Sequence, residues 1–377
     1  MRKTLLVGAL AGVFASMAHA QSSVTLYGLI DAGITYTNNY QGHSNWQQTS
    51  GMINGSRWGL RGAEDLGGGL KAIFTLENGF NINTGTLGQQ SREFGRQAYV
   101  GLSSEQFGTV TLGRQYDDVV QYLGPLALTG TQYGGTTFAH PYDNDNLDNS
   151  FRVNNSVHYQ TPSYGGFKLG AMYGFSNSAG AFSNNRAYSI GASYNWAGFN
   201  FAAAYLQVNN GLSSNTTTAL GTNTGGAVTD SYFTAGRQRI WGAGLNYTFG
   251  PATAGFVFTQ SRVDNLTTIA NVGTLPGSNS MRFNNYEVNA RYALTPSLSL
   301  AGEYTFTDGR LNNADPKWHT VGLQADYMLS KRTDVYLEGE YQHVSQDGTG
   351  LTAYINGLRP STTPNQVAVT AGIRHRF

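Results

Sequence analysis

Residues 286–306 read YEVNARYALTPSLSLAGEYTF, and this stretch decides the fold because it alternates twice around a short break. Tyr286 and Val288 fall on one side of an extended chain, whereas Glu287 falls on the other. After the letters ALTPS the alternation returns over residues 298–306. A period of two places successive side chains on opposite faces of a sheet, so the stretch predicts a β hairpin.

The same alternation recurs from residue 24 to the end of the chain, and the composition agrees with it. Charged residues make up 12% of the 377, about half of the roughly 25% that is usual in soluble proteins. Gly occurs 49 times, with 23 Tyr and 19 Phe. The aromatic content argues against disorder. A helical membrane protein would need several apolar runs of about 20 residues, which the sequence lacks. The composition therefore favours a large all-β protein.

The connections between the alternating segments are of two kinds, long and short. Eight are longer and polar, and seven are short: 64–69, 103–108, 161–166, 195–198, 249–252, 293–297 and 329–334. Seven short turns join fourteen strands, and one strand at each end of the chain makes sixteen. Short turns on one rim and longer loops on the other are typical of a transmembrane antiparallel β-barrel with an even number of strands.

The side chains also predict which face of the strands meets lipid. Hydrocarbon cannot solvate charged groups such as Glu287, Glu303, Glu338 and Arg374, so we expect the polar face to line water. The apolar face is then expected to meet lipid. Aromatic residues near the short turns are expected to form an interfacial girdle: Trp196, Phe199, Tyr247, Phe249, Tyr292 and Tyr327.

The N-terminus has the pattern of an export signal. Arg2 and Lys3 precede an apolar stretch and an A-x-A site at residues 18–20. We expect residues 1–20 to be cleaved and residues 21–377 to form an outer-membrane barrel. Removing two of 23 basic residues leaves 21 against 22 acidic ones, a balance that offers no basic surface to nucleic acid. The chain has no Cys, so it uses no disulfide framework.

Four stretches carry a resemblance to a known family: SSVTLYGLIDAGI, SRWGLRGAEDLGGGLKAIFTLE, GRQAYVGLSSEQFGTVTLGRQYD and the ending AGIRHRF with its terminal Phe377. Over essentially the whole mature sequence, the chain resembles the trimeric general porins of Gram-negative bacteria, in the branch found in β-proteobacteria. The resemblance implies a sixteen-stranded barrel, three barrels per trimer, and a third long loop that folds into each lumen as a constriction. It also implies that Phe377 is a signal for the barrel-assembly machinery.

Residues 115–150 are the longest segment without alternation, and they follow the fifth strand, where the resemblance places the constriction loop. A loop of more than about 12–15 residues without regular structure is usually functional or disordered. A mobile external loop is therefore the alternative. The acids expected on this side of the constriction are Asp117, Asp118, Asp143, Asp145 and Asp148.

The opposing basic wall is implied by the resemblance at Arg57, Arg96 and Arg152. Alternation places Arg57 on the same face as Arg61, and Arg114 completes the candidate set. The alternative for each arginine is a solvated or salt-bridged surface residue. Arginines that face carboxylates across narrow water create a strong transverse field. Such a field would favour hydrophilic solutes, which exchange water for charged partners, over apolar ones.

Catalytic and metal-binding motifs are absent from the sequence. It contains no G-x-S-x-G or H-E-x-x-H motif, and its histidines lack metal-ligand spacing. We therefore expect neither an enzyme nor a cofactor or metal. A purely adhesive barrel is disfavoured because sixteen strands leave room for a channel.

The expected function is an outer-membrane porin for passive diffusion of small hydrophilic solutes and ions. A porin selective for phosphate or an organic anion is the alternative. The expected partners are further copies of the chain in a homotrimer, outer-membrane lipid and lipopolysaccharide, and the assembly machinery.

Overall fold

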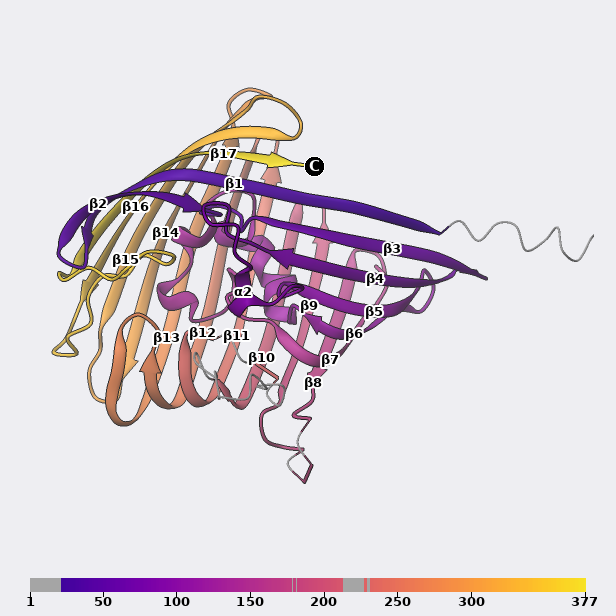
Figure 1. Cartoon of the computed structure of the whole chain (residues 1–377), viewed down its shortest axis with the longest axis horizontal. Helices are drawn as coiled ribbons and strands as arrows, with labels where there is room; N and C mark the ends of the chain where they lie inside the picture. The colour runs from indigo at the N-terminus through magenta and orange to yellow at the C-terminus, as the bar shows by residue number, and fades with distance from the viewer. Residues whose placement is uncertain (1–21, 178, 181, 213–226, 229–230) are drawn as a thin grey trace, which may run out of the picture.

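The structure, a computed structural model, describes most of the chain from residue 22 to residue 377. The residues that it leaves undescribed after residue 21 are 178, 181, 213–226 and 229–230. The expected export signal, residues 1–20, lies outside the described residues. The described chain forms one continuous antiparallel sheet that curves around a central space (Figure 1).

The sheet contains seventeen strands in the described part of the chain. Their bounds are β1 (Ser23–Tyr40), β2 (His43–Ser50), β3 (Arg57–Gly67), β4 (Leu70–Gly79), β5 (Gln97–Ser104), β6 (Gly108–Gln115), β7 (Val153–Gln160), β8 (Phe167–Gly174), β9 (Ala187–Trp196), β10 (Phe199–Leu212), β11 (Phe233–Phe249), β12 (Ala252–Ile269), β13 (Gly273–Ala293), β14 (Leu298–Leu311), β15 (Lys317–Met328), β16 (Thr333–Ser345) and β17 (Asn365–Arg376). The helical pieces are short: α2 (Gly88–Ser91), η1 (Val119–Leu123), η2 (Gly124–Leu126), η3 (Leu128–Gly130), η4 (Gly135–Phe138) and η5 (Pro141–Asp143). No helix in the described residues is long and apolar enough to cross a membrane.

The first strand closes the barrel and also explains the odd number. One edge of β1 pairs with β17, from Leu29 opposite Arg376 to Thr37 opposite Ala368. Its other edge pairs with β2 over the C-terminal half and with β3 over the N-terminal half. Because β2 and β3 share one neighbour end to end, they form one interrupted wall strand. The expected sixteen-stranded antiparallel barrel is therefore confirmed.

The two rims of the barrel differ in the way that the sequence predicts, with one refinement. All seven short turns connect neighbouring strands where they were expected. On the other rim, several polar connections continue the strand ladder instead of leaving it. The β12–β13 hairpin, for example, pairs from Ala252 with Tyr292 up to Ile269 with Gly273. Polar residues form strands here because antiparallel pairing satisfies their backbone groups, whatever the side chain.

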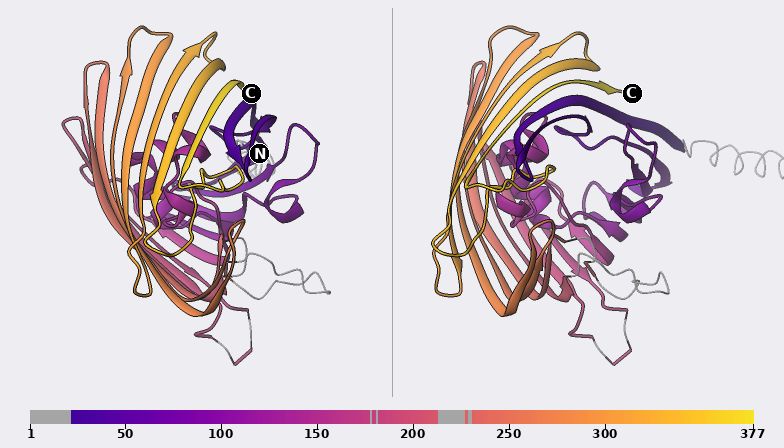
Figure 2. Two further views of the ribbon diagram at one scale, coloured as in Figure 1. Left: turned by 90° about the vertical axis from the view of Figure 1, so that its left-hand side faces the viewer. Right: turned by 60° about the vertical axis from the view of Figure 1, so that its left-hand side comes forward.

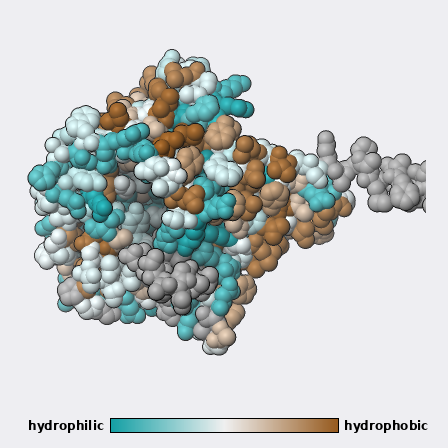
Figure 3. Space-filling model, viewed as in Figure 1, coloured by the Kyte–Doolittle hydropathy of each residue, from teal (hydrophilic) through white to brown (hydrophobic). Residues whose placement is uncertain are grey.

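The outer and inner faces follow the alternation closely along β11–β17. Val288 and Leu323 are exposed on the outer face, whereas Glu287, Glu303 and Glu338 are buried on the inner face. The expected girdle residues lie on the rim of short turns, where Phe199 stacks on Tyr247 with ring centroids 4.3 Å apart. Figure 3 shows hydrophobic residues gathered towards this rim and hydrophilic residues over the opposite end.

The long segment between β6 and β7 lies inside the barrel, against the inner face of the wall (Figure 2). Glycines of β11 make room for it: a Cβ atom at Gly242 would lie 3.0 Å from Leu123, and one at Gly244 would lie 3.1 Å from Leu126. Apolar residues of the segment are buried there, so this stretch of the inner face is packed by side chains and not by water.

The inner segment makes a second apolar contact with the inner face of the barrel, where a polar face was expected. Tyr142 from the segment packs edge-on against Phe233, Phe283 and Trp318, with ring centroids 6.4, 6.1 and 6.2 Å apart. Phe283 has the same strand parity as Glu287 and therefore points inward. The inner face is apolar where the segment covers it, because those side chains meet protein.

Candidate functional site

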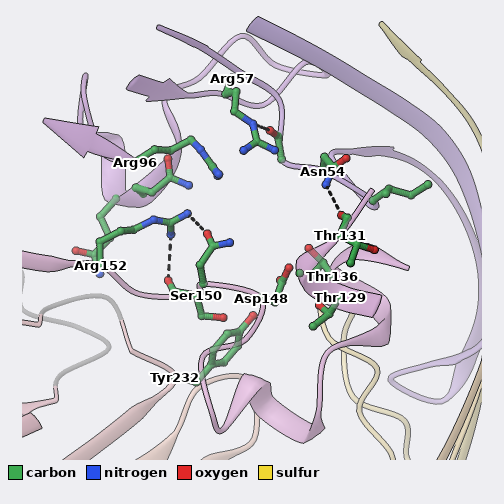
Figure 4. Close-up of a pocket in the computed structure, with 16 residues that line it drawn as sticks. Asn54, Arg57, Arg96, Thr129, Thr131, Thr136, Asp148, Ser150, Arg152 and Tyr232 are labelled. Atoms are coloured by element: carbon green, nitrogen blue, oxygen red, sulfur yellow. Dashed lines mark hydrogen bonds between the residues drawn. The ribbon is translucent and has the colours of Figure 1, made fainter. Parts of the chain in front are cut away.

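Three of the sequence-predicted arginines meet at one cavity inside the barrel. The cavity has a volume of about 470 Å³, and its lining includes Arg57, Arg96 and Arg152. Figure 4 shows their side chains in an arc, facing Thr129, Thr131, Thr136 and Asp148 across the opening. Arg57 begins β3, and Arg96 and Arg152 directly precede β5 and β7, whereas the facing residues all belong to the inner segment.

Arg57 begins β3, immediately after the interruption in the wall. Its Nε donates a hydrogen bond to the Gly55 carbonyl oxygen at 2.9 Å. The preceding residues are fixed by Asp31, whose Oδ2 accepts hydrogen bonds from the backbone N–H groups of Ile53 and Asn54 at 3.1 and 2.9 Å. The break between β2 and β3 thus places an arginine and a set of polar backbone groups at the cavity.

Arg96 lies just before β5, and its charge has a partner. Its Nε donates to Glu77 Oε1 at 2.7 Å, and its Nη2 donates to the Tyr116 hydroxyl at 2.9 Å. The other oxygen of Glu77 accepts a hydrogen bond from Tyr27 at 3.0 Å. This buried pair holds the Arg96 head group in one position, because moving it would leave Glu77 without its cation.

Arg152 precedes β7 and completes the arc. Its guanidinium lies over the Tyr116 ring, 5.4 Å from the centroid, and its Nη2 donates to Asn149 Oδ1 at 2.5 Å. Tyr116 therefore contacts Arg96 through its hydroxyl and Arg152 through its ring. Sequence reasoning overlooked Tyr116 and Glu77. The acidic residue that ends the FTLE motif was the available signal, because it alternates onto the inner face of β4.

Arg61 and Arg114 do not line the cavity. Arg61 is exposed and lies 5.3 Å over the Tyr27 ring. Arg114 is buried and donates to the Gly95 carbonyl at 2.8 Å and to Asn154 Oδ1 at 2.5 Å. The register of β6 against β7 shifts after Gly113, so a bulge turns Arg114 away from the exposed face of Leu112. This bulge also explains why Arg114 is buried although Leu112, two residues before it, is exposed.

Of the five acids expected opposite the arginines, Asp148 lines the cavity. It is half-buried, and its backbone N–H donates to Asp143 Oδ1 at 3.0 Å. Burial, followed by the charge of Asp143, raises the pKa of Asp148 above the usual range for an aspartate. The other residues of the inner segment that line the cavity are uncharged. One of them, Thr131, accepts a hydrogen bond at its carbonyl oxygen from Asn54 Nδ2 at 3.2 Å.

Asp117 and Asp118 are fully buried and bind the start of the inner segment. Asp117 Oδ1 accepts the backbone N–H groups of Val119 and Val120 at 2.8 and 3.3 Å, like an N-cap on η1. Asp118 Oδ1 lies 2.9 Å from His158 Nε2, and its other oxygen accepts from Ser189 at 2.5 Å. Both carboxylates face the strands and the segment itself, and neither lines the cavity.

Asp143 and Asp145 bind the far end of the segment. Asp143 accepts the backbone N–H groups of Asp148 and Ser150 at 3.0 and 2.9 Å. Asp145 Oδ2 lies 2.6 Å from His140 Nδ1. The other nitrogen of His140 lies 3.2 Å from Glu287 Oε2 on β13, so one imidazole stands between two buried carboxylates.

His140 is an anchor that the sequence did not reveal. Although burial alone lowers it, the charge of Asp145 and then Glu287 hold the pKa of His140 well above its ordinary value. The protonated ring donates a hydrogen bond from Nδ1 to Asp145 and forms an ion pair with Glu287 through Nε2. It therefore joins the inner segment to the barrel wall through its positive charge.

Phe377 occupies the junction at which the barrel closes. Its backbone N–H and carbonyl oxygen pair with those of Gly28, both at 3.0 Å. A Cβ atom at Gly28 would lie 2.2 Å from the Phe377 ring, so the absence of a side chain on β1 lets the ring cross it. The residue as a whole is 41% exposed.

Known proteins resemble the chain over its whole length. The Gram-negative porin family matches residues 6–349. An outer membrane porin of Bordetella pertussis is 33% identical, and outer membrane porin protein 32 of Delftia acidovorans is 32% identical; each match covers 100% of both chains. Among solved structures, an anion-selective porin from Comamonas acidovorans is 27% identical with a TM-score of 0.74, covering 95% of this chain and 100% of the other. The closed sixteen-stranded barrel and these full-length matches show that the chain belongs to the family of Gram-negative porins, proteins of the outer membrane.

Proposed function

We propose that the chain forms a water-filled channel through which small hydrophilic solutes and ions diffuse passively, and that the cavity beside the three arginines is its constriction. The observation that carries the proposal is the arc of Arg57, Arg96 and Arg152 around one opening inside the barrel. Residues 115–150 are the constriction loop in this proposal. Their position against the inner wall supports it.

The charges around the cavity favour anions. Three guanidinium groups face Asp148, and Glu77 offsets the charge of Arg96, which leaves an excess of one positive charge when both acids are ionised. The interaction between charges is strong here because the low-dielectric wall focuses the field across a narrow passage. The related Comamonas protein is an anion-selective porin, which supports the same sign.

The test is planar-bilayer recording with the purified protein in a gradient of potassium chloride. Stepwise currents are expected, with a reversal potential displaced to the side that indicates faster passage of chloride. The displacement should shrink in concentrated salt, since the Debye length falls from about 10 Å at 0.1 M to about 3 Å at 1 M. If no stepwise currents appear, the proposal of a channel is wrong. If the reversal potential indicates faster passage of potassium, the role assigned to the arginines is wrong.

A channel selective for oxyanions is the second candidate, and the arginine arc is what favours it. Planar guanidinium groups recognise phosphate and carboxylate in a bidentate manner. A binding site would make the phosphate current saturate with concentration, whereas simple diffusion keeps it proportional. The relatives are porins, which are channels, and we propose no catalytic activity.

We further propose that the chain works as a homotrimer, with the outer face of β1–β6 at the interface. The support is a group of exposed apolar side chains there: Val24, Leu26, Ile34, Trp46, Val100, Leu102, Val110 and Leu112. Burying them between subunits would remove them from lipid or detergent. A monomer in mild detergent, measured by light scattering, would contradict this arrangement.

The two ends of the chain are proposed to act in its export and assembly. Residues 1–20 would direct export and be removed, and Phe377 would be read by the assembly machinery. Its place at the closing seam supports a role in the final pairing of β1 with β17. Deleting Phe377 should reduce the amount of folded barrel in the membrane, and normal assembly of the shortened chain would refute this role.

A further inference from the structure

Two histidines face each other across neighbouring strands on the outer face of the barrel. His319 of β15 pairs in register with His343 of β16, and the ring centroids lie 6.5 Å apart. The two strands lie side by side in Figure 1. The histidines continue the alternation of Val321 and Tyr341, the pair two positions further along, both of which are exposed on the outer face. We refer to His319 and His343 as the histidine pair.

The histidine pair lies near the rim of longer connections. His319 follows the start of β15 by two positions, and His343 precedes the end of β16 by two positions. Both residues are partly buried. The polar connections at 312–316 and 346–364 begin directly beyond these strand ends. Dissolved ions can therefore reach the pair.

One ring nitrogen of each histidine is held by a neighbouring side chain. His319 Nδ1 lies 2.7 Å from the Tyr304 hydroxyl, and His343 Nδ1 lies 2.8 Å from Asn365 Oδ1. Asn365 Oδ1 also accepts a hydrogen bond from the Tyr341 hydroxyl at 2.7 Å. Because this oxygen is an acceptor, the proton of the neutral His343 ring lies on Nδ1, which leaves the lone pair on Nε2. The Tyr304 hydroxyl can accept from His319 in the same way.

This arrangement is the one in which proteins present an imidazole to a metal ion. A ligating histidine donates its other N–H to a neighbouring group, which fixes the tautomer and the orientation of the ring. Within the described part of the chain, neither Nε2 atom of the histidine pair has a hydrogen bond or an ion pair. Both lone pairs are therefore available to a ligand.

The spacing of the rings suits a shared ion. Two imidazoles whose nitrogens lie about 2.0–2.1 Å from one metal ion have ring centroids roughly 5–6 Å apart. The observed 6.5 Å is slightly longer. A small rotation of either ring about its side-chain bonds would bring both Nε2 atoms onto one ion, since the Cβ atoms of a cross-strand pair are only about 4.5–5.5 Å apart.

The surroundings of the histidine pair do not oppose a cation. The basic neighbour on the same face, Lys317, lies directly opposite Asp308 of β14, so its charge is balanced. Among the described residues, no group of three or more His, Asp or Glu side chains could hold a metal ion. The protein would thus supply two ligands, and water would fill the remaining coordination positions.

We propose that the histidine pair binds a divalent transition-metal cation, copper(II) more tightly than nickel(II) or zinc(II). Imidazole suits all three ions, and the affinity of a given set of ligands peaks at copper(II). The spacing of the histidines along the sequence could not reveal this site, because the register of β15 against β16 brings them together. The site lies on the outer face, so the proposal does not depend on ion passage through the lumen.

The test is calorimetric titration of untagged, metal-free, folded protein in detergent with copper(II) chloride. We expect one ion per chain. Loss of a group that only orients a ligand typically weakens metal binding 10–100-fold. We therefore expect Tyr304→Phe to bind about tenfold more weakly, and His319→Gln and His343→Gln, which remove a ligand, at least a hundredfold more weakly.

The matched control is His375→Gln. His375 lies on the outer face at the opposite rim, where its cross-strand neighbours are Ile30 and Thr333 and not a second histidine. This variant should bind copper(II) like the native protein.

Two further titrations test the class of ion. Zinc(II) should bind more weakly than copper(II) and compete with it. Millimolar calcium should not displace copper(II), because calcium prefers oxygen ligands. The proposal is overturned if the native protein binds no copper(II), if either histidine-pair variant binds like the native protein, if His375→Gln abolishes binding, or if calcium competes. Single-channel currents of the variants should stay native, so failure here and failure of the proposed channel are separately visible.

Discussion

The wall of the barrel consists of two unequal parts, β1–β9 and β10–β17. Apart from the long strand β1, the first part has short strands, an interrupted wall strand and a bulge at Gly113, and it carries all three cavity arginines. The second part has long strands whose pairing is regular except for bulges near the rim of longer connections. Its inner face receives the part of the inner segment around His140 and Tyr142. The three cavity arginines thus come from the irregular part of the wall, whereas the inner segment that they face is anchored on the regular part.

The largest effect should come from breaking the anchor on the regular part. His140→Leu would leave the Asp145 and Glu287 carboxylates buried without their cation, a loss that typically costs about 3–5 kcal/mol. We expect the inner segment to leave the wall, with faster proteolysis inside residues 119–150 and noisier single-channel currents. His343→Leu, on the outer face, is the matched control. Equal protease resistance in the His140 variant would show that the aromatic contacts of Tyr142 hold the segment alone.

The same anchor makes a prediction about pH. Because the pKa of His140 is raised in the folded protein, its contribution to stability is complete below the ordinary histidine value of about 6.5. The contribution is lost as the pH rises through the raised value. The segment should therefore become protease-sensitive as the pH rises into the alkaline range, and protection that does not fall with rising pH would contradict a charged imidazole.

A smaller loss of stability should follow from adding a side chain at the bulge in the irregular part of the wall. Gly113 has a φ of +144°, and a Cβ atom there would lie 2.1 Å from the Ala98 carbonyl oxygen. Gly113→Ala should cost about 1–3 kcal/mol and lower the unfolding temperature. Gly339→Ala in regular β16, where the nearest atom would be 3.8 Å away, should be nearly neutral. Equal losses at the two sites would remove the contrast between the two parts.

The smallest of these effects concerns the charge of the inner segment. Since the pKa of Asp148 is raised, this carboxyl should take up a proton as the pH falls, well before an ordinary aspartate does. Anion preference should then grow with falling pH. Asp148→Asn should show the higher preference at every pH, whereas Asp347→Asn on an external loop should keep the native profile. A native channel whose reversal potential is independent of pH would contradict the assignment.

The regular part of the molecule could be predicted in detail from the sequence. Residues such as Val288 and Glu287 face lipid and interior as their alternation indicates, because each environment selects one class of side chain. The prediction was incomplete where protein meets protein. Phe283 and Tyr142 form an apolar contact inside the barrel, and nothing local in the sequence marks the inner face as covered there.

At the cavity, the basic residues could be predicted better from the sequence than the acidic residues opposite them. Arg57, Arg96 and Arg152 come together because each lies at the start of a strand, β3, β5 or β7, within one region of the wall. The acids lie on a segment with little regular structure. Which of them faces the cavity depends on turns such as the one at Asp143, whose φ is +43°. Side-chain type alone could not separate Asp148 from the structural acids Asp117 and Asp118.

The central claim is that the arginine arc sets the passage of ions, and one measurement tests it most directly. The reversal potential in gradients of about 0.1 M salt, where screening is weak, is compared between the native channel and Arg57→Gln/Arg152→Gln, with Arg310→Gln on the outer face as control. We predict a shift towards cations in the double variant, because the cavity loses two of its positive charges, and no shift in the control. Unchanged reversal potentials in the double variant, with stepwise currents intact, would contradict the claim.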